Sequence, residues 1–126
     1  MSAQVFMCYA PEDQPLARYL AVTLQAHGVN LRSHSMPRCD QFLLVWSVHA
    51  AESREVSRQV DAARAQGLPM VALIVGGDTP PPDSFAQVMC STPAQALTAL
   101  ATLAQRYGVT LGTVTPPDAA LFAPRD

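Results

Sequence analysis

Few residues of this chain have side chains that could act as acids or border a polar ligand, and they follow the ends of apolar segments. The apolar run from Val5 ends in the aromatic Tyr9, and after a short turn Asp13 stands where an amphipathic helix begins. A second apolar run ends in Trp46 and is followed by Ser47. If both runs are parallel strands of one sheet, these four residues gather at its carboxyl edge, where α/β folds bind ligands.

A second group of reactive types lies between those two runs. His34, Cys39 and Asp40 share one polar segment, and His49 follows the second run. Their spacing matches no known metal-ligand pattern, so we expect solvated loop residues and no metal site. A Cys39 nucleophile activated by His34 or His49 is conceivable in principle but has no supporting motif.

Alternating strand and helix patterns supply the elements that position these side chains. Leucines recur at four-residue spacing after Asp13, which predicts a helix with one buried face, and Asp13 itself is expected to cap that helix. A continuous apolar run such as 42–46 is typical of a strand covered on both faces. The pattern predicts strands at 4–10, 29–32, 42–46, 70–75 and 85–90, helices at 11–27, 53–66 and 92–107, and loops at 33–40 and 76–84.

Strands that alternate with helices favour a mostly parallel sheet with helices on both faces. We therefore predict an α/β protein with one three-layer, flavodoxin-like domain and a five-stranded sheet in the order 2-1-3-4-5. The switch point of this order lies between strands one and three, beside Asp13 and Ser47. The domain is expected to span residues 1–107, and the Pro-, Thr- and Ala-rich tail 108–126 to form a short strap or a flexible end.

Composition excludes several classes of function. The 126 residues carry a net charge of −2, so the chain lacks the positive charge that is typical of nucleic-acid-binding proteins. No apolar stretch is long enough for a membrane span. All eight basic residues are Arg, which excludes a P-loop and a response-regulator receiver domain because both need a lysine. The odd cysteine count, with Cys8 and Cys90 inside apolar runs, and the absence of a signal-peptide pattern predict a cytoplasmic protein.

Three segments in order resemble the boxes of Toll/interleukin-1 receptor (TIR) domains, particularly the bacterial forms. The first is Phe6-Met7-Cys8-Tyr9-Ala10 with Asp13, although Cys8 stands where the family usually has Ser. The second is the run 39–47, and the third extends from Ser53 to the strand 70–75. The resemblance covers about the first 75 residues and implies the same flavodoxin-like fold; an unrelated domain of that fold is the alternative.

The resemblance also implies where an enzyme would keep its catalytic acid. In TIR domains that cleave NAD, a Glu on the third-box helix contacts the ribose, and its charge can stabilise the oxocarbenium-like transition state. The matching residue here is Gln59, a neutral amide that cannot accept a proton. Glu55 lies one helical turn earlier on the same face and could substitute for it.

A second departure from the family is a contraction. TIR domains normally have a long loop and a helix between strands two and three, which wall the nucleotide pocket and mediate assembly. Only residues 33–40 stand at that place here. A pocket that lacks one wall buries less ligand and excludes water poorly.

Both departures favour a non-catalytic TIR-like interaction module, an adaptor, scaffold or regulator that pairs with a protein partner or with itself and needs no cofactor. The helix face that carries Arg54, Arg58 and Glu55 is either a solvated surface or part of such a contact. The alternative function is an NAD-cleaving or nucleotide-binding enzyme that uses Glu55. A third is a small hydrolase or nuclease with Asp13 and Asp40 as acids.

Overall fold

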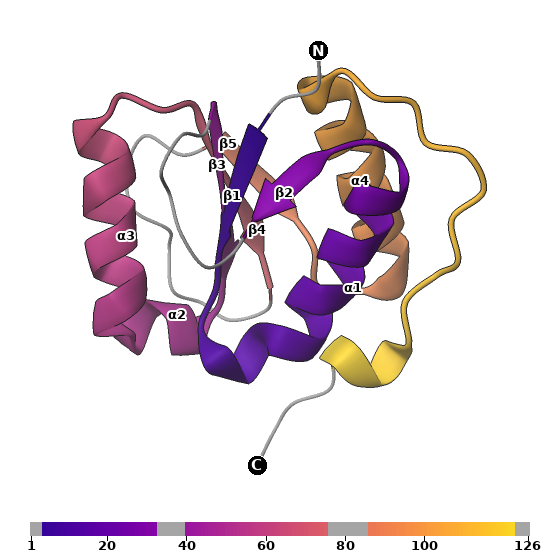
Figure 1. Cartoon of the computed structure of the whole chain (residues 1–126). Coiled ribbons are helices and arrows are strands. Elements are labelled where there is room, and N and C mark those ends of the chain that lie inside the picture. Colours follow the sequence, from indigo (N-terminus) through magenta and orange to yellow (C-terminus); the bar gives the residue numbers. More distant parts are fainter. Residues whose placement is uncertain (1–3, 33–39, 76–85, 123–126) are drawn as a thin grey trace.

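The structure of the protein is a computed structural model that describes residues 4–32, 40–75 and 86–122 (Figure 1). Strands and helices alternate along these residues. In chain order the elements are β1 (Gln4–Cys8), a 3-10 turn η1 (Pro11–Asp13), α1 (Gln14–Ala26), β2 (Asn30–Arg32), β3 (Gln41–Trp46), α2 (Val48–Glu52), α3 (Arg54–Ala65), β4 (Met70–Ile74), β5 (Ala86–Met89), α4 (Pro93–Tyr107) and a second 3-10 turn η2 (Ala119–Phe122).

All five strands form one parallel sheet in the order β2-β1-β3-β4-β5. The predicted fold class and strand order are therefore confirmed. In the centre of the sheet Phe6 pairs in register with Phe42, and Phe42 with Met70. The strand order reverses between β1 and β3, so their carboxyl ends border the switch point.

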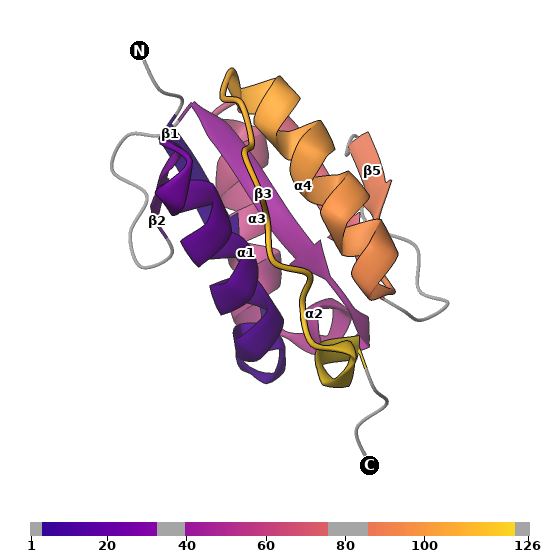
Figure 2. The ribbon, with the colours of Figure 1, turned by 90° about the vertical axis from the view of Figure 1, so that its right-hand side faces the viewer.

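Helices cover both faces of the sheet and make three layers (Figures 1 and 2). Helices α1 and α4 lie on one face, and α2 and α3 lie on the other. Side chains of β3 alternate between the two faces, and Phe42 to Val45 are fully buried. The prediction that this strand is covered on both sides is confirmed.

The α1/α4 face holds the larger of two apolar clusters. The predicted leucine stripe of α1 is buried, with Leu16, Leu20 and Leu24 at most 1% exposed. Helix α4 inserts a row of small residues and leucines, and Leu97 lies only half-buried beside that row. The sequence spacing predicts Leu97, Leu100 and Ala104 as the inner stripe, and the helix is rotated slightly from it, because Ala96 and Ala99 allow closer contact with the sheet than leucine would. The buried residues of α4 are Ala96, Ala99, Leu100, Leu103, Ala104 and Tyr107.

The α2/α3 face is built around two stacked aromatic rings. Phe6 of β1 and Phe42 of β3 lie with ring centroids 5.8 Å apart and planes 14° apart. Helix α3 covers them with the predicted stripe Val56, Val60 and Ala63, each at most 3% exposed. Cys8 belongs to this cluster and Cys90 to the other, and both thiols are buried as predicted.

Two further local predictions differ from the structure. The first helix was expected to begin at Pro11, but a 3-10 turn comes first and α1 starts at Gln14. Pro15 lacks the N–H that would bond back to residue 11, so the chain turns more tightly before the α-helix begins. Helix α2 was not predicted, since five residues are too few to show a helical period. The predicted loops 33–40 and 76–84 lie outside the described residues, except for Asp40.

The segment after α4 forms a strap that runs between α1 and α4 (Figure 2) and packs on the apolar cluster of that face. Gly108 ends α4 in the left-handed region, with φ of 76°. Val109, Leu111 and Val114 then pack partly buried against the α1/α4 cluster. The Tyr19 hydroxyl donates a hydrogen bond to the Thr115 carbonyl at 2.6 Å, which fixes the middle of the strap to α1.

Burial of the two thiols makes the stability of the fold sensitive to alkaline pH. Burial raises the pKa of Cys8 from 9.0 to about 12 and that of Cys90 to about 11. Between these values the unfolded chain ionises its thiols and the folded chain does not. The free energy of unfolding should therefore be constant below about pH 9 and fall above it, by up to about 1.4 kcal/mol per pH unit for each thiol.

Urea unfolding at several pH values between 7 and 11 measures this slope. Without lysines, Cys39 and the tyrosines are the other side chains that titrate in this range, and burial raises the pKa of Tyr107 in the same sense. The variants Cys8→Ala and Cys90→Ala should each flatten the slope, whatever their cost at neutral pH. An unchanged slope in both variants would contradict the assignment.

Candidate functional site

The switch point is closed by a buried hydrogen bond between the two loops that border it. The hydroxyl of Ser47, directly after β3, donates a hydrogen bond to the carboxylate of Asp13, at the end of η1. Asp13 is 8% exposed and Ser47 5%, and they are the buried polar residues of the described chain. A buried carboxylate needs such donors, because desolvation without them is costly. We call this pair the switch-point latch.

Ser47 also starts the helix that was not predicted. Its Oγ accepts a hydrogen bond from the Ala50 amide at 3.2 Å, so the same hydroxyl caps α2 and binds Asp13. Asp13 occupies the cap position of α1, but its carboxylate makes no capping bond to that helix. The expected capping role of Asp13 is therefore wrong. Its side chain is drawn to the serine because the 3-10 turn directs it toward β3 rather than along α1.

A second polar pair joins the same two loops at the surface. His49 Nδ1 of α2 lies 3.4 Å from Glu12 Oε2 of η1, and both side chains are more than one-third exposed. This contact was not predicted, since His49 was assigned to a solvated loop. No sequence signal links positions 37 residues apart in this way; only the β1–β3 pairing brings them together.

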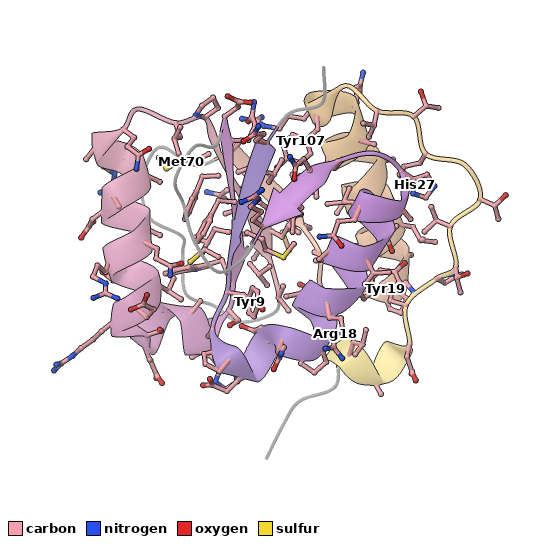
Figure 3. The ribbon with its side chains drawn as sticks, in the orientation of Figure 1. Tyr9, Arg18, Tyr19, His27, Met70 and Tyr107 are labelled. Carbon is pink, nitrogen blue, oxygen red and sulfur yellow. The ribbon has the colours of Figure 1, made fainter. Side chains whose placement is uncertain are left out.

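Tyr9 and Trp46 point to opposite faces of the sheet and do not share one crevice. Tyr9, at the carboxyl end of β1 (Figure 3), is half-buried against the α1/α4 cluster. Trp46 belongs to the α2/α3 cluster and is 8% exposed. The four predicted crevice residues thus divide into the latch, formed by Asp13 and Ser47, and two aromatic side chains that pack into separate cores.

Gln59 is half-buried on α3 and engaged by its own helix. Its amide donates a hydrogen bond from Nε2 to Glu55 Oε1 at 2.9 Å. Arg58 donates to the second oxygen of the same carboxylate. The Glu55 charge also contributes to the raised pKa of Cys8, after burial. The carboxylate of Glu55 therefore acts on the carboxyl end of β1 across the α2/α3 face.

A pocket of about 200 Å³ lies between α2, α3 and the end of β3. Ligand pockets for drug-sized molecules are typically larger, roughly 300–1,000 Å³, so a dinucleotide does not fit here. Of the predicted site residues only Trp46 lines it. Its walls are Trp46, Ala50, Ala51, Ser57, Val60, Asp61 and Arg64.

The two acids of the hydrolase hypothesis lie at opposite ends of β1. The Gln4 amide donates to Asp40 Oδ2 at 3.2 Å where β1 begins, whereas Asp13 follows its end. Five extended residues separate them by roughly 16 Å, too far for shared acid–base work on one bond. His34 and Cys39 lie outside the described residues, and within the described part of the chain no three His, Cys, Asp or Glu side chains gather in a metal-binding group.

The fold and the latch define a doubly wound α/β domain with a polar, closed switch point. No protein-family model and no curated protein sequence matches the chain. Among the helices of the described residues, none has the length and apolar character that a membrane crossing requires.

Ser47 and Ser53 allow the latch to be measured separately from helix capping. Both hydroxyls cap a helix, Ser47 through Ala50 and Ser53 through the Val56 amide at 3.3 Å, but only Ser47 binds a buried carboxylate. We expect Ser53→Ala to cost about 1 kcal/mol of unfolding free energy. Ser47→Ala should cost about 1–3 kcal/mol more, because it leaves the Asp13 carboxylate without that donor.

Urea unfolding of both variants at pH 7 provides the comparison. Ser47→Thr, which keeps a hydroxyl, should recover part of the loss. Equal costs for the two alanine variants would mean that the latch adds nothing beyond the cap.

Proposed function

We propose that this chain is a TIR-like interaction module that works by association with a protein partner or with itself rather than by catalysis. The observation that carries the proposal is the bond between Gln59 and Glu55. At the position where the resemblance implies a catalytic glutamate, a neutral amide donates a hydrogen bond to a neighbouring side chain. It therefore supplies no negative charge for a developing cation.

The closed switch point supports the same conclusion. The Ser47 hydroxyl donates to Asp13 and accepts from the Ala50 amide, so its hydrogen-bonding capacity is largely used inside the fold. The latch residues are both less than one-tenth exposed. Groups that stabilise the fold in this way hold two loops in a fixed shape, which suits a rigid surface for docking.

An NAD-cleaving or nucleotide-binding enzyme is the second candidate, and one observation favours it. The Glu55 charge contributes, after burial, to the raised pKa of Cys8 at the carboxyl end of β1, so this carboxylate acts on the region where the resemblance implies a crevice. Arg58 and Gln59 donate hydrogen bonds to it. In this candidate Glu55 would take the role of the missing acid.

The buried cysteines and the net charge of the chain support a proposal for the cellular setting and the partner. Two buried free thiols suit a reducing compartment such as the bacterial cytoplasm. A net charge of −2 gives no attraction to nucleic acid, so we propose a protein partner.

Release of nicotinamide from NAD distinguishes the two candidates. The module should release none above the uncatalysed rate. Gln59→Glu restores the negative charge. A gain in turnover, on the order of 10²–10³ in rate, would show that the crevice is intact and lacks only this charge. Gln66→Glu adds the same charge at the exposed end of α3 and should change nothing.

Turnover by the unmodified protein would overturn the proposal. If that turnover is lost in Glu55→Gln, a variant of nearly equal shape, the enzyme candidate takes its place. Unfolding curves of each variant establish that any loss reflects chemistry and not stability.

A further inference from the structure

The pocket between α2, α3 and the end of β3 has an apolar floor. Trp46, Val60 and Ala50 line it, one from each of these elements, and each is at most 8% exposed. The volume of the pocket is about 200 Å³. An engineered apolar cavity of about 150 Å³ is large enough to bind benzene. The floor can therefore take one apolar group of about the size of a single ring. We call this cavity the α3 pocket.

The mouth of the α3 pocket is polar and comes from one flank of α3. Ser57, Asp61 and Arg64 stand four and three residues apart, so they share one side of the helix, and all three line the pocket. The Asp61 and Arg64 side chains are 72% and 48% exposed. The pocket therefore joins a buried apolar floor to a hydrated, charged mouth.

Two opposite charges stand side by side at this mouth. Arg64 Nη1 lies 4.0 Å from Asp61 Oδ1, which is longer than a hydrogen bond. An arginine can donate two parallel hydrogen bonds to a carboxylate, and an aspartate can accept from an ammonium group. A ligand with only one charge would meet one of these side chains with its own sign. The mouth therefore matches a ligand that carries both charges close together.

We propose that the α3 pocket binds a free α-amino acid with an apolar side chain. Such a molecule carries an ammonium and a carboxylate on one carbon atom, directly beside the apolar group. Its side chain would lie on the floor formed by Trp46 and Val60. Its carboxylate would face Arg64 and its ammonium Asp61, while the Ser57 hydroxyl can donate to the first or accept from the second.

Exposure of the two charges sets the strength of binding. Water and salt screen exposed ion pairs, so each contributes little affinity. The apolar floor supplies most of the binding free energy, and the charges select the zwitterion over other small molecules. We therefore expect a dissociation constant on the order of 1 mM for a ligand with about twelve non-hydrogen atoms.

Titration of the full chain with L-phenylalanine tests the proposal. Trp46 is the single tryptophan of the chain and lines the α3 pocket, so its emission should shift and reach saturation as the pocket fills. Saturation-transfer NMR on the ligand gives a second signal that does not depend on this side chain. The analogues 3-phenylpropionate, which lacks the ammonium, and 2-phenylethylamine, which lacks the carboxylate, should each bind about fivefold more weakly.

Two exposed substitutions assign the charges to their partners. Arg64→Gln should weaken binding of L-phenylalanine about fivefold but should not weaken binding of 2-phenylethylamine, which has no carboxylate. Asp61→Asn should weaken L-phenylalanine by a similar factor but should not weaken 3-phenylpropionate, which has no ammonium. Arg106→Gln removes an exposed arginine from α4, on the other face of the sheet, and should bind like the unmodified protein. Urea unfolding checks that each variant is folded.

The absence of both signals at about twenty times the expected dissociation constant would overturn the proposal. Equal binding of L-phenylalanine and its two analogues would also overturn it, as would binding that neither charge substitution weakens. The α3 pocket goes beyond the proposed interaction module and does not depend on it. Failure here would leave that proposal and its nicotinamide measurement unchanged.

Discussion

The hydrogen bond from Ser47 to Asp13 joins the two places where the chain leaves the centre of the sheet. One carboxylate and one hydroxyl, both buried, decide how η1 turns away from β1 and how α2 begins after β3. Because the serine also caps α2, the direction of α3 depends on the same atom. The layer that contains α3 is therefore oriented by a polar contact at the switch point.

Ligand-binding α/β proteins keep polar groups at the carboxyl edge of the sheet available for a substrate. Here Asp13 and Ser47 satisfy each other, while Glu12 and His49 pair above them. The edge becomes a fixed corner of the molecule, and the features that vary in charge and shape lie along α3. A fixed corner beside a charged helix agrees with the interaction module proposed above.

Periodicity in the sequence predicted most of the fold but not the contacts that organise it. The apolar run 42–46 and the stripe Leu16, Leu20 and Leu24 were unambiguous because burial repeats at fixed spacing. Helix α2 was not predicted, because five residues are too few to show a helical period. The later start of α1 was not predicted either, because the missing N–H of Pro15 does not alter the apolar stripe of that helix. The site was predicted in part: the switch point located Asp13 and Ser47, but the bond between them depends on side-chain direction after a 3-10 turn. Tyr9 and Trp46 are buried on opposite faces of the sheet. The sequence spacing does not reveal this, because two loops separate the strands.

The strap has a consequence for how the molecule could be joined to others. Helix α4 ends at the edge of the sheet where β1 begins, and the strap carries the chain back across the domain to η2, which contacts α1 (Figure 1). The polypeptide therefore emerges beside the start of α1, at the edge opposite to the one where it entered. A tag or domain appended beyond the strap would be tethered beside α1, at the end of the sheet where the latch lies. Without the strap, the same tag or domain would be attached at the end of α4, beside the start of β1.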